Sequence, residues 1–275
     1  MALLSLKTRL ATGIPQLGLA VMYPAPGVVE RIGPDWDWVW IDGQHGEMGY
    51  DETLQLVRAC DLIERPALVR VSDHGFGNIG KTLDMGAAGV IVPCVDTVEQ
   101  ARAVVAAAKF PPLGNRSFGA RRAVDRSSRR YANTSNDEIL CVVQIESPAA
   151  ISNASAIAAL PGVDALFLGP DDLMLRRGYD VDEARNEAAL GDDMRTVAKA
   201  CRDHGKFAVM VGVDPSMFKL CVEVGFHLIV AGGDVPFLVQ GSRKASAEAR
   251  ATLAGLTNGS EPSGKARHAT VASPS

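Results

Sequence analysis

The sequence predicts an α/β protein built as a single closed (β/α)₈ barrel of the TIM type. Eight short apolar segments recur along the chain, and helical patterns fill most of the intervals between them. The length of 275 residues, with 47% hydrophobic side chains, suits one such barrel, which typically needs about 250 residues. A doubly wound open sheet is the alternative fold for the same alternation of strands and helices.

The expected strands are short and apolar throughout, which is typical of parallel strands buried on both faces. In chain order they cover residues 17–21, 38–41, 67–71, 89–92, 141–145, 165–168, 207–211 and 228–231. Helix starts follow several of them. Ser147 and Asp214 each precede a proline, and Asp96 is followed by Glu99 three residues later, as in a capping box.

Two stretches fall outside this alternation. Residues 110–137 are rich in arginine and poor in periodicity, so we expect a long loop or an excursion of short helices that covers a site or contacts a neighbouring subunit. Residues 257–275 are polar and rich in Gly, Pro and Ser, which predicts a disordered tail. The predicted barrel domain therefore spans residues 1–256.

The bulk composition excludes several classes of partner and compartment. A net charge of −4 and a pI near 5.8 provide no basic footprint for nucleic acid. No run of 18 apolar residues and no signal-peptide pattern occur, so we expect neither membrane insertion nor export. The five cysteines are scattered and form no CxxC motif, which predicts neither disulfides nor a zinc site and fits a reducing cytoplasm.

Polar residues concentrate where the expected strands end, which is where a (β/α)₈ barrel carries its chemistry. The second strand runs into IDGQHG, the third into RVS, the fifth into QIES and the sixth into GPDD. The candidates that these ends supply are Asp42, His45, Arg70, Gln144, Glu146, Gly169, Pro170, Asp171 and Asp172. Four separate strand ends thus bring acidic, basic and guanidinium groups to one mouth.

Glu146 and Asp172 are the candidate metal ligands. Because side chains alternate along a strand, Gln144 and Glu146 share the inward face, and an inward carboxylate needs a partner or a cation. Two carboxylates without a His or Cys cluster favour a hard cation such as Mg²⁺, Mn²⁺ or Co²⁺. The alternative is that both acids only cap helices or form ion pairs. We expect Asp171 to be solvated.

Arg70 and His45 are the candidate catalytic groups. A guanidinium at a strand end can bind a substrate carboxylate or the oxygen of an enolate. Its alternative role is a buried ion pair with Asp42 or Glu146. His45 follows Asp42 by three residues, so Asp42 can orient the imidazole while it transfers protons near neutral pH. The alternative for His45 is an ordinary surface histidine.

Two glycine patterns are weaker signals. Residues 75–80 read GFGNIG, formally the GxGxxG of dinucleotide-binding proteins, but they follow the third strand rather than the first. The pair Gly232 and Gly233 after the last strand can approach a phosphate or simply form a turn.

Taken together, the strand-end motifs resemble the HpcH/HpaI aldolases of the phosphoenolpyruvate/pyruvate-barrel superfamily. The matching stretches are WVWIDGQHG at 38–46, LVRVS at 68–72, GAAGVIVPCVDTVEQARAVV at 86–105, VVQIES at 142–147 and VDALFLGPDDL at 163–173. The resemblance extends from about residue 5 to 255. Departures include Gln44 where the family often has Glu, Ala20 where some members have an aromatic residue, and Asp171 where Ala is frequent.

The resemblance implies roles for individual residues. It makes Glu146 and Asp172 the metal ligands, Arg70 the group that steadies a pyruvate enolate, His45 with Asp42 the proton-handling dyad, and Gln144 a contact to the keto acid. It also implies that residues 169–171 line the substrate site. A homohexamer with an exchanged last helix is implied as well, with an active site completed by a neighbouring subunit. The candidates for that contribution are Asp84, Arg116 and Phe118.

The predicted function is that of a class II aldolase, which uses a divalent metal ion, takes a 2-keto acid such as pyruvate as enolate donor and an aldehyde as acceptor. A class I mechanism needs a lysine at a strand mouth, whereas Lys81, Lys109, Lys199, Lys206 and Lys219 fall on expected helices or at strand entries. Decarboxylation of oxaloacetate is the alternative at the same site. An NAD-dependent oxidoreductase and a non-catalytic binding barrel are the alternatives of other classes.

Overall fold

Eight parallel strands close into a barrel in the order of the sequence, with β1 hydrogen-bonded to β8. The computed structural model describes residues 5–258 of the chain. The strands are β1 Gln16–Val21, β2 Trp38–Asp42, β3 Ala67–Arg70, β4 Gly89–Val92, β5 Leu140–Ile145, β6 Ala165–Leu168, β7 Phe207–Val211 and β8 Leu228–Gly233. All eight expected strands are confirmed. The alternative of an open sheet is excluded, because an open sheet has two unpaired edge strands whereas β1 and β8 pair with each other here.

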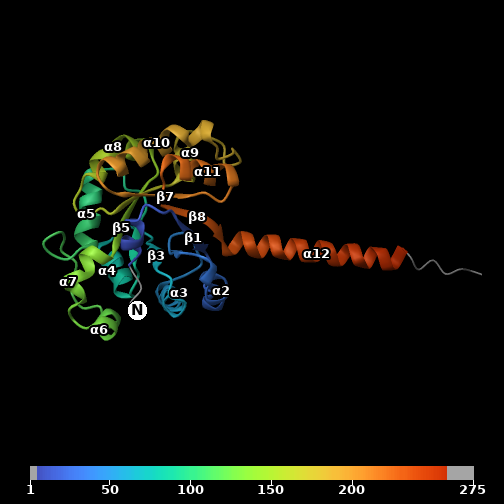
Figure 1. Cartoon of the computed structure of the whole chain (residues 1–275), viewed down its shortest axis with the longest axis horizontal. Helices are drawn as coiled ribbons and strands as arrows, with labels where there is room; N and C mark the ends of the chain where they lie inside the picture. The colour runs from blue at the N-terminus through green and yellow to red at the C-terminus, as the bar shows by residue number, and fades with distance from the viewer. Residues whose placement is uncertain (1–4, 259–275) are drawn as a thin grey trace, which may run out of the picture. The chain divides into compact units, whose positions relative to one another are not determined.

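Helices connect the strands and surround the barrel, and further helices precede the first strand and follow the last one (Figure 1). The helices of residues 5–258 are α1 Leu6–Leu10, α2 Pro26–Ile32, η1 Gly33–Asp35, α3 Tyr50–Leu62, α4 Phe76–Asp84, α5 Val98–Ala108, α6 Arg121–Ser127, α7 Tyr131–Glu138, α8 Pro148–Ala158, α9 Pro170–Arg176, α10 Glu187–Asp203, α11 Pro215–Val224 and α12 Asp234–Asn258. Over residues 5–258, none of these helices is long and apolar enough to cross a membrane.

The helix starts agree with the sequence prediction at two of three places. Ser147 caps α8 and Asp214 caps α11, each ahead of a proline. The third prediction was wrong by one residue, because α5 begins after Thr97, which forms a capping box with Gln100. The carboxylate of Asp96 instead accepts a hydrogen bond from the Ser147 hydroxyl at 2.5 Å.

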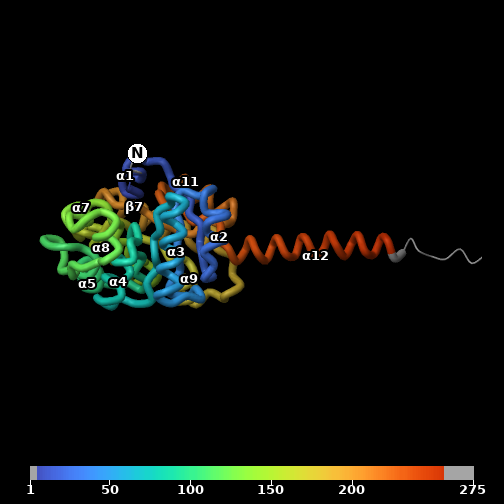
Figure 2. Tube along the Cα trace, turned by 90° about the horizontal axis from the view of Figure 1, so that it is seen from below, coloured from blue at the N-terminus to red at the C-terminus, as the bar shows by residue number. Residues whose placement is uncertain are grey.

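Large side chains fill the interior of the barrel below its mouth. Trp38, Trp40 and Phe167 belong to one buried cluster that the strands share with Leu6 and Leu10 of α1. Helix α1 closes the end of the barrel at which the strands begin (Figure 2). Opposite Trp38 the chain needs a glycine, since a Cβ on Gly18 would lie 2.5 Å from the indole ring. The barrel interior is therefore a packed core rather than a pore, and ligands of such barrels bind at the C-terminal mouth.

The two stretches outside the alternation differ from each other. The arginine-rich segment 110–137 contains α6 and most of α7, in agreement with the expected short-helix excursion. Of the described residues, 236–258 form a unit separate from 5–235, and α12 continues through Asn258, two residues past the predicted domain boundary. The rest of the expected disordered tail, 259–275, lies outside the described residues. Exchange of the last helix between subunits stays a prediction.

Candidate active site

Asp42 and Arg70 form a buried, two-pronged ion pair at the mouth of the barrel. They end neighbouring strands β2 and β3 in direct register. Arg70 donates through Nε to Asp42 Oδ1 at 2.8 Å and through Nη2 to Oδ2 at 2.5 Å. Burial alone raises the pKa of the Asp42 carboxyl, but the hydrogen bonds and charge of Arg70, with two backbone N–H groups, hold that pKa below its ordinary value.

The ion pair with Asp42 fixes the position of the Arg70 guanidinium but leaves part of it available to bind a ligand. The ion pair considered as an alternative role is present, but it uses only Nε and Nη2, which leaves Nη1 outside it. The same guanidinium lies over the Trp40 ring, with Arg70 Cζ 4.7 Å from the ring centroid. Trp40 in turn makes an edge contact with Phe167, with 5.5 Å between ring centroids. Arg70 is thus held from two sides, as an oxyanion-binding group needs to be.

Glu146 follows strand β5 and is 2% exposed. Its Oε1 accepts the backbone N–H of Cys94 at 2.6 Å, and its Oε2 accepts Gln144 Nε2 at 2.5 Å. The Cys94 backbone has a φ of 55°, a left-handed conformation that is rare for a residue with a side chain. A Cβ on Gly169 would lie 2.7 Å from Glu146 Oε2, so only glycine fits beneath this carboxylate.

A pocket of about 150 Å³ gathers most of the predicted residues. We call it the active-site pocket, and its lining residues are Trp40, His45, Arg70, Gln144, Glu146, Phe167, Gly169, Pro170, Asp171, Asp172 and Val211. No lysine is among them, which agrees with the argument against a Schiff base. Lys109, one of the lysines considered for that role, bonds to Asp164 at the start of β6, at the other end of the barrel.

The expected contact between the Asp42 carboxylate and the His45 imidazole is not formed. Asp42 Oδ1 accepts the backbone N–H of His45 at 3.2 Å, and no hydrogen bond within residues 5–258 joins the ring to Asp42. Arg70 engages both oxygens of the Asp42 carboxylate instead, so the expected pairing with the imidazole is wrong. His45 is exposed at the rim of the pocket, so its ring has access to a bound ligand.

The oxygen donors of the pocket fit a hard divalent cation. Glu146 and Asp172 both line the pocket, and each Glu146 oxygen accepts one hydrogen bond, which leaves a further lone pair on each for a metal ion. Within the described part of the chain, no group of three or more His, Cys, Asp or Glu side chains can hold a metal. Two carboxylates would be the protein's contribution, completed by water and substrate, as Mg²⁺ sites usually are.

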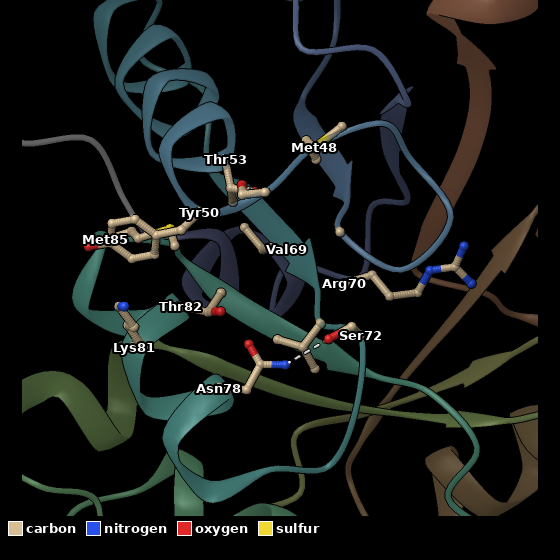
Figure 3. A pocket seen from close by; sticks show the side chains of 13 residues that line it. Met48, Tyr50, Thr53, Val69, Arg70, Ser72, Asn78, Lys81, Thr82 and Met85 are labelled. Atoms are coloured by element: carbon tan, nitrogen blue, oxygen red, sulfur yellow. Dashed lines mark hydrogen bonds between the residues drawn. The ribbon is translucent and has the colours of Figure 1, made fainter.

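A larger cavity, of about 280 Å³, lies behind strand β3 against α3 and α4. Figure 3 shows that the Arg70 guanidinium points away from it, while Ser72 and Asn78 are hydrogen-bonded at its wall. The Lys81 ammonium lies 4.3 Å from the centroid of the Tyr50 ring. None of its 13 lining residues is acidic, so this cavity has no carboxylate for a metal ion.

The remaining predicted residues lie elsewhere. Arg116 and Asp84 bond to each other at 2.8 Å within the chain, and Phe118 stacks on Tyr131. None of Asp84, Arg116 and Phe118 lines the active-site pocket of their own chain, so a cross-subunit role stays a prediction. The Asp171 side chain is 61% exposed and pairs with Arg185, in agreement with its expected solvation.

The glycine motif at 75–80 opens α4. There the carboxylate of Asp73 accepts the backbone N–H of Gly75 at 2.6 Å. The backbone N–H of Gly75 at the start of α4 is therefore already paired within the chain and is not free to bind a phosphate.

Sequence reasoning missed four residues of the site: Trp40, Phe167, Val211 and Cys94. Alternation along the strand offered a signal for Trp40, which lies two residues before Asp42 and therefore faces inward with it. Phe167 precedes Gly169 in the same way. For Cys94 there was no signal, because its role depends on a backbone conformation that its residue type does not favour.

Comparison with known proteins places this site in context. The sequence profile of the HpcH/HpaI aldolase/citrate lyase family matches residues 29–240. The chain is 32% identical to the 2-keto-3-deoxy-L-rhamnonate aldolase of Klebsiella pneumoniae over 242 residues, 85% of this chain and 88% of that one. It is 33% identical to the hydroxypyruvate/pyruvate aldolase of Cupriavidus necator, covering 89% and 91% of the two chains. The solved structure of macrophomate synthase is similar with a TM-score of 0.80 at 26% identity, covering 92% and 91%.

Proposed function

Because the chain belongs to the HpcH/HpaI aldolase/citrate lyase family, we propose that it is a class II aldolase. It cleaves or forms the C3–C4 bond of 4-hydroxy-2-keto acids, with pyruvate or a related 2-keto acid as enolate donor and an aldehyde as acceptor. The metal is a divalent cation of the Mg²⁺, Mn²⁺ or Co²⁺ type, held by Glu146 and Asp172.

One observation carries the proposal more than the others. Arg70, held by Asp42 and Trp40, lines the same small pocket as the two carboxylates. A 2-keto acid needs this combination, because its carboxylate and ketone oxygens can chelate a cation while a guanidinium meets the oxygen on which charge develops.

The residues divide the retro-aldol reaction between them. A bound cation would supply a Lewis acid that polarises the ketone of the substrate. A base takes the proton of the C4 hydroxyl, the C3–C4 electron pair moves into the enolate of the departing keto acid, and C3 later regains a proton. Arg70 stabilises the enolate oxygen, and His45 at the rim is the candidate proton carrier.

Removal of the metal tests this proposal. Treatment with a chelator should abolish aldol cleavage, and Mg²⁺, Mn²⁺ or Co²⁺ should restore it. Glu146→Gln, which removes one ligand charge from a buried site, should require a higher Mn²⁺ concentration for half-maximal activity and should bind Mn²⁺ more weakly in calorimetry. Full turnover by the chelated protein would reject the metal mechanism.

A further inference from the structure

Asp234 is a buried carboxylate without a cationic partner. It follows strand β8 directly, is 2% exposed, and forms no salt bridge within the described part of the chain. Its oxygens accept three backbone N–H groups instead, those of Met22 at 3.1 and 3.0 Å, Tyr23 at 3.0 Å and Val235 at 2.8 Å. A buried charge is costly unless hydrogen bonds satisfy it. Here backbone donors do so, and two of the three belong to the loop after β1, more than 200 positions away.

The loop after β1 in turn holds the segment that carries His45, residues 43–49, which we call the His45 segment. The Met22 carbonyl accepts the backbone N–H of Glu47 at 2.9 Å. Gly46 lies against the same carbonyl, since a Cβ on Gly46 would be 2.9 Å from the Met22 oxygen. Met22 therefore bonds to the buried carboxylate through its N–H and to the His45 segment through its carbonyl.

The position of the His45 imidazole depends on the backbone of this segment. The residue is exposed at the rim of the active-site pocket, and its ring makes no hydrogen bond within the part of the chain that the structure describes. On one side, the His45 N–H donates to Asp42 Oδ1 at 3.2 Å. On the other side, the bond from Glu47 to Met22 holds the segment. Proton transfer needs a well-placed group, and a displacement of about 1 Å can lower a rate by roughly 10²-fold.

We infer that Asp234 is a positioning residue for His45, because it holds Met22, and Met22 holds the His45 segment at the pocket. Asp234 does not itself line the active-site pocket, so it acts through His45 and not on a ligand. The inference rests on the proposed aldolase function, in which His45 is the candidate proton carrier. Asparagine has nearly the shape of aspartate, but one of its two terminal groups is a donor, which would face a backbone N–H of the loop.

A double-mutant cycle tests this link in the Mn²⁺-loaded enzyme, with 4-hydroxy-2-oxopentanoate as the substrate for cleavage. Asp234→Asn should lower kcat about tenfold, while the calorimetric Kd of pyruvate stays unchanged. In the His45→Ala background the same substitution should lower kcat less than about twofold, because no imidazole is left to position. An unchanged kcat in Asp234→Asn, or equal losses in the two backgrounds, would overturn the inference, since a merely structural role does not depend on His45.

Hydrogen exchange tests the same link without turnover. In Asp234→Asn the amides of the His45 segment should exchange faster, because the Met22 carbonyl that accepts from Glu47 is no longer held. Unchanged exchange there would also overturn the inference. If Asp234→Asn does not fold, Asp234→Ser, which keeps one acceptor oxygen, provides the same comparisons. If the wild type does not cleave the substrate, the proposed function fails, and exchange still decides whether Asp234 holds the His45 segment.

Asp37→Asn is the matched control. The Asp37 carboxylate also accepts a backbone N–H of β1, from Leu17 at 2.8 Å, but it does so at the strand starts. The same chemical change at this end should alter neither kcat nor exchange in the His45 segment. An equal loss of kcat in both variants would overturn the inference, because it would assign the effect of Asp234→Asn to a general weakening of the barrel.

Discussion

Buried ions occur at both ends of the barrel, but they are paired to different degrees. Near the strand starts, Lys109 is 0% exposed and donates to Asp164 at 2.7 Å and to the carbonyls of Asn136 and Ile139. Asp164 also accepts from Lys7 and from the Cys141 backbone. At the mouth, Arg70 and Asp42 bond to each other, but Gln144 and Trp40 beside them retain unpaired buried atoms.

This difference in hydrogen-bond pairing distinguishes polar groups that stabilise the fold from polar groups at the binding site. A buried polar cluster with every atom paired stabilises one conformation of the chain, and the Lys109–Asp164 cluster joins α1, the segment after α5 and the start of β6. A cluster with unpaired buried atoms stabilises the fold less, because each unpaired atom has lost its hydrogen bonds to water without replacement. We therefore expect substitutions near the strand starts to lower stability and substitutions at the mouth to lower activity.

The largest expected effect is on stability. Asp164→Ala leaves the Lys109 ammonium buried without its counter-ion, and breaking one partner of a buried pair costs about 3–5 kcal/mol. Urea denaturation should show this loss in the free energy of unfolding, while kcat of the folded enzyme stays near the wild-type value. A loss of kcat without a loss of stability would contradict the division between the two ends.

Asp203→Ala is the control for that variant. Asp203 pairs with Lys199 one helical turn away on α10, but both side chains are exposed, so the pair should contribute less than about 1 kcal/mol. The contrast isolates burial as the cause of the effect at Asp164.

The second effect is on catalysis. Arg70→Lys keeps the positive charge but loses the planar fork that bonds Asp42 twice. If Arg70 stabilises the enolate in the transition state, kcat and kcat/KM should fall together, by roughly 10²-fold. A raised KM with kcat preserved would instead assign Arg70 to anchoring the substrate carboxylate. Normal kinetics with a lowered Tm would reject any catalytic role.

Arg177→Lys controls for the loss of the fork itself. Arg177 donates hydrogen bonds to Asp193 through both terminal nitrogens, but it does not line the active-site pocket. This variant should leave kcat and KM unchanged, so a loss of activity in Arg70→Lys cannot be attributed to a broken Arg–Asp fork in general.

The barrel was predictable because its strands are continuous apolar runs, and burial on both faces requires such runs. The predicted cap Asp96 was wrong because two adjacent residues can cap α5, and Thr97 has the glutamine three residues later that completes a capping box. Asp96 itself bonds to Ser147, a residue 51 positions away, which no local pattern shows.

The site was predictable as a set of residues but not as a set of bonds. Strand-end position was enough to gather Arg70, Gln144, Glu146 and Asp172 into one pocket. The partner of the Asp42 carboxylate depends on which side chains lie within hydrogen-bonding distance of it. Arg70 lies in direct register on β3 and donates two hydrogen bonds to it. Trp40 was overlooked because a tryptophan in an apolar strand looks like core, and its place in the pocket wall beneath Arg70 appears only in the structure.

The smallest expected effect concerns pH near the strand starts. His227 Nδ1 accepts the Ala208 backbone N–H at 3.2 Å, and burial lowers the pKa of this imidazole below its ordinary value. The folded state therefore keeps His227 neutral where the unfolded chain already binds a proton. The corresponding stability is fully present above the ordinary pKa of about 6.5 and is lost as the pH falls through the lower folded value.

His227→Asn keeps an acceptor for Ala208 but cannot titrate, so it isolates this effect. Wild-type Tm should fall more steeply than that of the variant between pH 7 and pH 5, and the two curves should run parallel above pH 7.5. Equal slopes throughout would mean that protonation of His227 costs the fold nothing. In that case the hydrogen bond to Ala208 would not stabilise the strand starts in the way that the Lys109–Asp164 cluster does.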